Sequence, residues 1–441
     1  MRYEWEKLRC AACGQIFTAS VPAAAGTEKY TARARAVLAR ARYYLGLPWQ
    51  RLEGFQAVGG VPVPDATPWE QGESVGDCTH PLCKWLEKAA AQGEVIFQDD
   101  TPGRVLALIE ENQQARARAQ AQGKAQTTER TGMQTTALIV QVGARRIGLY
   151  YTGRRHAGEN LEQLLTKREP GRGKPLVLSD ALSHNHAEEA PLMRGHCLAH
   201  GRRQFTALAD DFPSEGAAVV DALKLVYDHD KQAHAQQLSA QERLVYHQTY
   251  SEPVFRALKT CLEQQPAPRL VEPNSSFGKA FAYRLEHWET LSRVLKEPGA
   301  PLDNNIAERA VKLAIRQRQN SLFYATEHSA YIASILTRVI ATWVQAGVHA
   351  LDYLVALQEH RQEGFATPSA WLPWNYQAAL VPSYRTGRHL GASCTRSGWP
   401  LPKSTFSSHA ESVTLAVVAV GHQENRPGER RLGQSQNPCP S

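Results

Sequence analysis

The sequence has little that would place the protein in a membrane or outside the cell. Its longest apolar run, at residues 413–420, is too short for a bilayer-spanning helix, which needs about 20 apolar residues. Residues 1–9 are charged and contain no apolar core, so they lack the pattern of a secretory signal. These absences predict a cytoplasmic protein with no membrane partner.

A disulfide framework is also lacking. The eight cysteines are spread over 441 residues, which favours reduced thiols. A chain of this length can hold about two or three domains and bury a real hydrophobic core. The net charge of +7 is compatible with a polyanionic partner but is too modest to indicate one by itself.

Residues 27–88 are predicted to form short helices. Apolar residues recur at helical spacing over 31–45, and a proline suited to a first helical turn opens a second segment at 48–58. Gly59 and Gly60 predict a turn, and residues 67–70 have a capping-box pattern that would start a third helix. This outline is that of a helix-turn-helix unit, although periodicity fits a generic small helical bundle equally well. If the region binds DNA, the candidate phosphate contacts are Arg33, Arg35, Arg40, Arg42 and Arg51.

Residues 91–180 change to strand-forming sequence. The segment 94–99 predicts a strand, and 135–142 with 146–152 predict an antiparallel pair joined by a tight turn at Gly143. A helix is predicted at 161–167. Residues 175–180 are an apolar run that ends in a carboxylate, which is typical of a buried strand with function at its C-terminal end.

Three acidic residues stand out in this order of elements, which is that of an RNase H-like core. In such a core the first and fourth strands are neighbours, so Asp99 and Asp180, each at the end of one of them, would share a site. Glu308 lies just inside a helix opened by residues 303–305, which cap helices well. Three clustered carboxylates need cations, and their hard oxygen atoms favour a pair of Mg²⁺ or Mn²⁺ ions.

Each acid also has a plainer interpretation. An Asp at a strand end is often a turn or cap residue, and Glu308 could simply favour the N-terminal dipole of its helix. Asp100 and Asp303 are competing acids beside the chosen ones. From spacing alone, the triad remains one interpretation among several.

Longer motifs add a resemblance. In chain order they are QDDT (98–101), LYYTGRRHAGEN (149–160), LSDA (178–181), CLAHGRRQF (197–205), PLDNNIAER (301–309) and NSLFY (320–324). Together they resemble the insertion sequence 66 family of bacterial transposases over about residues 5–376, with the motifs in the order that the family has them. The resemblance implies a DDE-type transposase whose triad maps onto Asp99, Asp180 and Glu308.

The resemblance also implies partners and chemistry. The protein would cleave phosphodiesters at transposon ends and join them to target DNA with two Mg²⁺ or Mn²⁺ ions. Its partners would be terminal-repeat DNA and target DNA, bound by a homo-oligomer. A catalytically inactive relic that only binds terminal-repeat DNA is the alternative, and a metal-independent helical scaffold is a third possibility from another class.

The fold class expected is α/β, an RNase H-like mixed sheet with a large helical insertion, preceded by a helix-turn-helix-like DNA-binding region. The expected divisions are a partial zinc-ribbon-like segment at 1–26, the DNA-binding region at 27–88, the catalytic core at 91–184 and 301–361, the helical insertion at 185–300 and a disordered tail at 379–441.

Two cysteine motifs could bind zinc. Cys10 and Cys13 resemble the second half of the family's N-terminal zinc ribbon, but no Cys or His precedes them, so zinc is doubtful there. Cys197 and His200 are spaced like half a metal site, which two ligands alone do not make. A buried cysteine and a hydrogen-bonded histidine are the plainer interpretation.

Four further cations are candidate DNA contacts. Arg202 and Arg203 follow His200 in one motif, and Lys312 and Arg316 lie one and two turns beyond Glu308 on the same helix face. A solvated helix face is the rival interpretation of the second pair.

Overall fold

The computed structural model describes residues 7–18, 20, 28–60, 63, 66–123, 130–206, 213–264 and 275–381. Within these residues no helix is both long enough and apolar enough to cross a membrane. The disordered tail predicted for 379–441 lies outside them from residue 382 onward.

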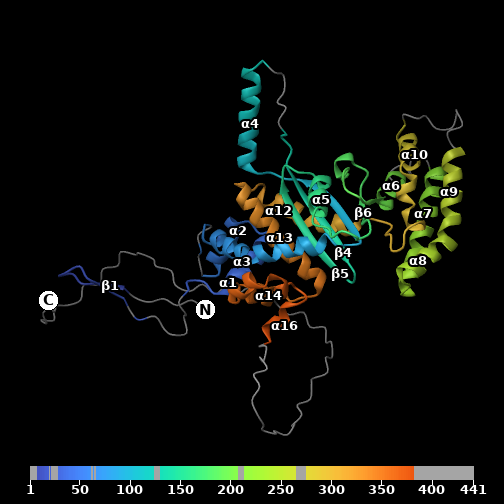
Figure 1. Ribbon diagram of the computed structural model, residues 1–441. Coiled ribbons are helices and arrows are strands. Elements are labelled where there is room, and N and C mark those ends of the chain that lie inside the picture. The colour runs from blue at the N-terminus through green and yellow to red at the C-terminus, as the bar shows by residue number, and fades with distance from the viewer. Residues whose placement is uncertain are drawn as a thin grey trace, which may run out of the picture.

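A mixed sheet of five strands lies at the centre of the molecule, in the order β5-β4-β3-β6-β7 (Figure 1). Its strands are β3 (Val95–Pro102), β4 (Gln134–Val142), β5 (Arg145–Gly153), β6 (Leu176–Ser179) and β7 (Met193–His196). Strand β4 is antiparallel to both β3 and β5, whereas β3, β6 and β7 run parallel to one another. The prediction that the first and fourth strands are neighbours is confirmed, because β3 pairs directly with β6.

Two details of the sheet differ from the sequence prediction. Strand β3 continues to Pro102 because residues 99–102 pair with residues 134–137 of β4, so Asp99 lies within the strand and not after it. Strand β7 falls inside the segment 185–300, which the sequence predicts to be a helical insertion. Its four residues include Arg194 and Gly195 and carry no strand pattern, and their pairing with β6 makes the strand.

The sheet is buried on both faces. Because side chains alternate along a strand, Ile96 of β3 joins one core with Leu138, Val140 and Leu149, while Phe97 joins a second core on the other face. The first core is covered by helices α3 (Ala66–Ala90), α5 (Ala157–Leu165) and α13 (Glu327–Ala346), and the second by helices of the region after β7. By the same alternation, Asp99 lies on the face of Phe97 and Asp100 on the face of Ile96.

The N-terminal helices belong to the first core. They are α1 (Ala32–Tyr43), α2 (Trp49–Val58) and α3 (Ala66–Ala90). The side chain of Thr31 caps α1 by accepting from the backbone N–H of Ala34 at 3.2 Å. The capping box predicted at 67–70 is wrong, because α3 already includes Ala66 and continues through Pro81 as one helix. Side chains of α1 and α3 pack in the same cluster as the sheet and α13.

The remaining helices surround the sheet or form a lobe beside it. Helix α4 (Leu106–Ala121) projects from the body, and α5 (Ala157–Leu165) lies against the sheet (Figure 1). The lobe contains α6 (Leu198–Thr206), α7 (Pro213–Ala235), α8 (Ala240–Tyr246), the π-helical η3 (His247–Ser251), α9 (Glu252–Gln264), α10 (Ser276–Glu286), α11 (Trp288–Leu291) and the short η4 (Arg293–Leu295). The chain returns to the sheet with α12 (Asn305–Ser321), α13 (Glu327–Ala346), α14 (Ala350–Glu359), α15 (Arg361–Ala366), η5 (Pro368–Trp371) and α16 (Tyr376–Leu380).

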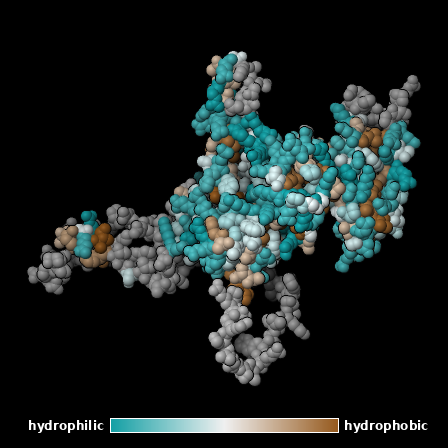
Figure 2. Space-filling model, in the orientation of Figure 1, coloured by the Kyte–Doolittle hydropathy of each residue, from teal (hydrophilic) through white to brown (hydrophobic). Residues whose placement is uncertain are grey.

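A short antiparallel hairpin stands at the N-terminus. It is formed by β1 (Lys7–Arg9) and β2 (Ile16–Thr18), and a turn carries Cys10 and Cys13 between them. Figure 2 shows a largely hydrophilic surface with apolar side chains gathered on this hairpin, where Leu8 and Phe17 are exposed.

Candidate active site

Three acidic side chains from separate parts of the chain meet on one face of the sheet. Asp99 comes from β3, Asp180 directly follows β6, and Glu308 lies in the first turn of α12. The pKa of Asp99 is raised to about 7, chiefly by burial; the negative charges of Asp180, Glu308 and Asp100 contribute to the rise, while a backbone N–H from Asp100 acts in the opposite direction. Phe97 of β3 pairs with Leu178 of β6, so Asp99 and Asp180 each lie two residues farther along these neighbouring strands, and α12, which carries Glu308, packs against β3. We call these three carboxylates the carboxylate corner.

Asn304 connects the elements that carry the corner. Its side-chain amide donates to the backbone oxygen of Gln98 at 2.8 Å, and its backbone N–H donates to the sulfur of Cys197 at 3.2 Å. Cys197 in turn donates its backbone N–H to the oxygen of Ser179 at 3.1 Å. Gln98 and Ser179 are the neighbours of Asp99 and Asp180, so this buried chain of contacts sets the relative positions of all three carboxylates. Sequence reasoning took Asn304 only for a helix cap.

A second amide holds Asp180. The side chain of Asn185 donates to an oxygen of Asp180, and the side chain of Gln98 donates to the backbone oxygen of Asn185. Asn185 is buried, in a short helical turn, η2 (Ser183–Asn185), between β6 and β7. Nothing in the sequence pattern marked Asn185, because its partners are set by how the loop after β6 folds back.

Asp100, unlike Asp99, is engaged in hydrogen bonds at the start of α5. One of its oxygens accepts from Thr136 Oγ1 at 2.5 Å, and the other accepts from the backbone N–H of Ala157 at 2.9 Å and faces His156 Nδ1 at 3.3 Å. Ala157 is the first residue of α5, so Asp100 satisfies a backbone donor at the start of that helix. Since it lies on the opposite face of β3 from Asp99, it is not part of the carboxylate corner.

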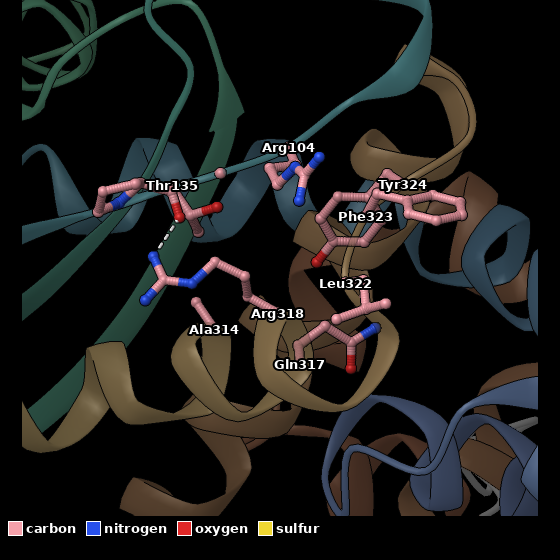
Figure 3. A pocket seen from close by; sticks show the side chains of 10 residues that line it. Arg104, Thr135, Ala314, Gln317, Arg318, Leu322, Phe323 and Tyr324 are labelled. Carbon is pink, nitrogen blue, oxygen red and sulfur yellow. Dashed lines mark hydrogen bonds between the residues drawn. The ribbon is translucent and has the colours of Figure 1, made fainter. Parts of the chain in front are cut away.

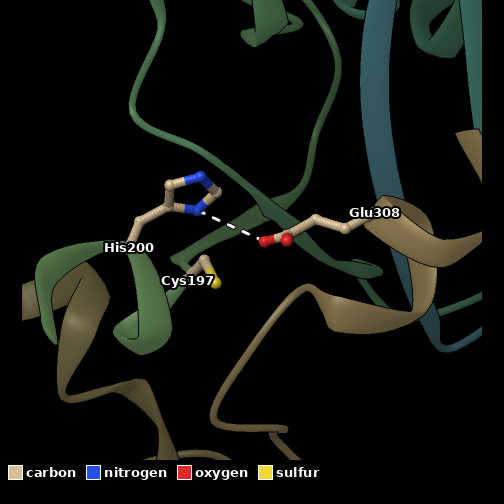
Figure 4. Close-up of side chains that lie close together, drawn as sticks. All are labelled: Cys197, His200 and Glu308. Atoms are coloured by element: carbon tan, nitrogen blue, oxygen red, sulfur yellow. Dashed lines mark ion pairs between the residues drawn. The ribbon is translucent and has the colours of Figure 1, made fainter. Parts of the chain in front are cut away.

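Glu308 is shared between two groups of the lobe. Its Oε2 accepts from Arg203 at 2.8 Å, while its Oε1 faces His200 Nδ1 at 3.6 Å, as Figure 4 shows. Cys197 lies beside this pair at the start of α6. Burial raises the pKa of the Cys197 thiol, although backbone N–H groups of Asn304, His200 and Ala199 act in the opposite direction.

Asp303 lies close to the corner but is occupied locally. Its two oxygens accept from the backbone and the side-chain amide of Asn305, at 3.1 and 2.8 Å. Burial raises the pKa of Asp303, and the negative charge of Glu308 contributes. Its oxygens are therefore engaged with the start of α12.

Comparison with known proteins identifies the chain. The family described as "Transposase IS66 family" matches residues 28–332, which include all three carboxylates. The chain belongs to the IS66 family of transposases. This membership supports a transposase function.

Individual relatives of this IS66 family member are uncharacterised. It is 30% identical over 199 residues to the uncharacterised protein y4jD of Sinorhizobium fredii (strain NBRC 101917 / NGR234), an alignment that covers 44% of this chain and 38% of y4jD. It is 23% identical over 375 residues to the uncharacterised protein y4qI of the same strain, covering 80% and 64% of the two chains. The chain thus spans less than two thirds of the length of these relatives.

The carboxylate corner of this IS66 family member fits a hard divalent cation. Its donor set is three carboxylates, the oxygen ligands that Mg²⁺ and Mn²⁺ prefer. Among the described residues Glu308 Oε1 has no hydrogen-bond partner, so one ligand atom is available. The pKa of Asp99 is raised because its negative charge is partly buried and lies near other carboxylates. A bound cation would stabilise that charge and reduce the repulsion.

Two of the four arginines of α1 are largely covered by neighbouring residues. Arg42 is buried, lies over the rings of Tyr43 and Trp49, and donates to Ser321 Oγ at the end of α12. Because α3, α13 and α14 pack against α1, Arg42 has little free surface for the predicted phosphate contact. Arg35 is mostly covered and pairs with Glu28 at 2.7 Å.

Other predicted cations remain at the surface. Arg33 is exposed and lies 3.9 Å from Asp352, and Arg40 lies over the Tyr44 ring. Arg51, Arg203, Lys312 and Arg316 are exposed, and Arg202 is half-buried. Arg316 donates to the backbone oxygen of Tyr44 at 3.2 Å, which joins α12 to the end of α1.

Two cavities lie away from the carboxylate corner. One, of about 10 Å³, is lined by Arg104, Arg318, Phe323 and neighbouring residues at the end of α12, where Arg318 donates to the oxygen of Pro102 at 2.6 Å (Figure 3). It has room for about one water molecule. The other, of about 470 Å³, is lined by residues of α3, β5, α5 and α13. Neither is lined by a residue of the triad.

Proposed function

We propose that this IS66 family member is a DDE-type transposase that cleaves phosphodiesters at transposon ends and joins them to target DNA. The observation that carries the proposal is the meeting of Asp99, Asp180 and Glu308 on one face of a mixed sheet, in a chain of this family. The order of elements and the adjacency of β3 and β6 support an RNase H-like core.

The three carboxylates would hold a pair of Mg²⁺ or Mn²⁺ ions, with Asp99 and Asp180 sharing one and Glu308 holding the other. When bound, such ions supply Lewis acidity and an activated water or 3′-hydroxyl for displacement at phosphorus. The residues of this chain set the geometry, because Asn304 and Asn185 position the half-buried carboxylates. Arg203 pairs with Glu308 and limits repulsion within the corner.

DNA would be the partner, both terminal repeats and target, and it would lie along the exposed cations near the corner. Arg203 is exposed on α6 and pairs with Glu308, and Lys312 is exposed on α12 one turn beyond Glu308. The N-terminal helices α1–α3 are the proposed helix-turn-helix-like reader, with Arg33, Arg40 and Arg51 as its phosphate contacts. A homo-oligomer in the DNA complex is part of the same proposal.

Asp180→Asn tests the assignment directly, because it keeps the shape of the side chain and removes only the charge. The loss of one metal ligand weakens the stabilisation of the charge that develops in the transition state. Mg²⁺-dependent nicking of a labelled transposon end should therefore fall by roughly a thousandfold or more. DNA binding, measured by gel shift, should persist. Asp100→Asn is the matched control, because that carboxylate lies on the other face of the sheet and should retain metal-dependent nicking where the variant is folded.

Full nicking activity in Asp180→Asn would show that the assigned site is wrong. A wild-type chain that binds terminal-repeat DNA but never nicks it, with either Mg²⁺ or Mn²⁺, would support the inactive relic in place of the enzyme.

A further inference from the structure

A second group of metal-ligating side chains adjoins the carboxylate corner. The sulfur of Cys197, a ring nitrogen of His200 and a carboxylate oxygen of Glu308 all lie within 4.8 Å of one another. Cys197 lies between β7 and α6, His200 lies in α6 and Glu308 in α12, and Figure 4 shows the His200 ring and the Glu308 carboxylate directed toward each other above the sulfur. The fold therefore adds a third ligand to a pair that the sequence alone left as half a site.

The distance between His200 Nδ1 and Glu308 Oε1 is too long for a hydrogen bond but fits two ligands of one metal ion. His200 Nδ1 and Glu308 Oε1 are 3.6 Å apart, and both atoms are buried without a hydrogen-bond partner among the described residues. Around a tetrahedral zinc ion, nitrogen, oxygen and sulfur ligands at their usual bond lengths are separated by about 3.3–3.7 Å. A metal ion between these atoms would satisfy both of them.

The surroundings also resemble those of a metal ligand. The backbone N–H of Asn304 donates to the Cys197 sulfur at 3.2 Å, and such outer contacts fix a ligating sulfur in place. Arg203 binds the other oxygen of Glu308, which leaves Oε1 facing His200. Cys197 is buried, whereas His200 is about one third exposed, so an ion can enter from the His200 side.

We propose that Cys197, His200 and Glu308 form a binding site for a thiophilic divalent cation such as Zn²⁺. Thiolate and imidazole select such an ion over Mg²⁺, which prefers oxygen ligands. Three protein ligands leave a fourth tetrahedral position for water or a phosphate oxygen. The site is distinct from the magnesium pair but shares Glu308 with it, so its occupation withdraws one oxygen of Glu308 from the carboxylate corner.

Cobalt binding tests the site without DNA. The full chain with Cys10→Ser and Cys13→Ser, which removes the N-terminal cysteine pair, is freed of metal and titrated with Co²⁺. We expect a thiolate-to-cobalt charge-transfer absorption that saturates at one thiolate-bound Co²⁺ per chain and that Zn²⁺ removes by displacement. In this background Cys197→Ser should abolish the absorption, and His200→Ala should weaken Co²⁺ binding by more than the roughly 10- to 100-fold that outer-shell changes cost.

Two controls separate this site from its neighbours. Cys261→Ser removes a different thiol, half-buried on α9, and should leave the absorption unchanged. Asp99→Asn removes a ligand of the magnesium pair only and should keep the thiolate absorption. Because Cys197 is buried, each variant is checked for the wild-type unfolding transition, and His200→Ala provides a test at a more exposed position.

Absence of a thiolate absorption in the background protein, or its persistence in Cys197→Ser, overturns the proposal. The proposed transposase activity would survive that result. A chain that binds Co²⁺ through Cys197 but never nicks DNA would overturn the activity and leave the metal site intact, so the two proposals fail separately. If both the activity and the metal site are as proposed, Zn²⁺ should inhibit Mg²⁺-dependent nicking, and Cys197→Ser should relieve this inhibition.

Discussion

The carboxylate corner and helix α1 both gather several charged side chains, and they hold these charges in different ways. At the corner, buried amides fix the elements that carry the acids: Asn304 joins β3 to α12, and Asn185 holds Asp180. On α1, by contrast, Arg42 is itself buried and joins α1 to the end of α12. At the carboxylate corner, neutral amides hold the charged side chains in place. On α1, the charged side chain of Arg42 itself holds two helices together.

The largest effect that would sharpen this comparison is expected at Asn304. Asn304→Ala removes the contact with Gln98 but no charge from the corner. Since small displacements of catalytic groups are costly, metal-dependent nicking should fall about 100-fold while DNA binding stays near that of the wild type. Asn305→Ala is the matched control, because its side chain contacts only Asp303 among the hydrogen bonds described, and it should lose much less. Equal losses in the two variants would contradict a special role for Asn304.

The adjacent acids of β3 should respond in opposite directions to the same substitution. Asp99 has a folded-state pKa of about 7, above its ordinary value of 3.8, so the folded state favours its protonated form. The stabilisation from protonated Asp99 is fully present at pH values below the pKa of Asp99 in the unfolded chain. It is lost as the pH rises through the folded-state pKa of about 7. In the metal-free protein Asp99→Asn should therefore increase the free energy of unfolding at pH 8 by roughly 2 kcal/mol, allowing for partial exposure, and by less at pH 5.

Asp100→Asn should instead destabilise the protein. It weakens the contacts with Thr136 and with the backbone N–H of Ala157, which together should cost about 2 kcal/mol. Denaturant unfolding of both variants at pH 5 and pH 8 measures the contrast. A stabilising Asp100→Asn, or an Asp99→Asn effect that does not grow with pH, would contradict the division of the two acids between the faces of the sheet.

The sequence was informative where local pattern decides structure. Apolar runs located β3, β4, β5 and β6, and the cap-forming residues 303–305 placed Glu308 in the first turn of α12. The sequence was uninformative where contacts between segments far apart in the chain determine the structure. Strand β7 exists because β6 offers it an edge, and the burial of Arg42 depends on Ser321, 279 positions away. The third ligand beside Cys197 and His200 likewise comes from a helix that only the fold brings near.

Arginines of the N-terminal helices should divide into a structural and a DNA-contacting class. Arg42→Ala should lower the free energy of unfolding by about 1–3 kcal/mol, because it removes a buried guanidinium and leaves its acceptors without a donor. Arg51→Ala, at an exposed position of α2, should leave unfolding unchanged and weaken DNA binding in all sequences alike. Thermal unfolding and gel shifts on both variants decide this. An Arg51→Ala variant that binds as tightly as Gln50→Ala, its exposed neutral neighbour, would remove α2 from the proposed interface.

The smallest effect is expected at Lys312, one turn beyond Glu308 on α12. Lys312 is exposed and is not among the buried residues of α12, so its loss should not disturb packing. As a single phosphate contact it should weaken DNA binding only a few fold, and it should reduce the slope of log affinity against log salt by about one. Gln319→Ala, two turns farther along the same helix and also exposed, controls for the surface change without altering charge. The salt series is the decisive measurement, because a general loss of structure would weaken binding without changing the slope in this way. An unchanged slope in Lys312→Ala would mean that this part of α12 is a solvated helix face and that DNA approaches the carboxylate corner from the side of Arg203.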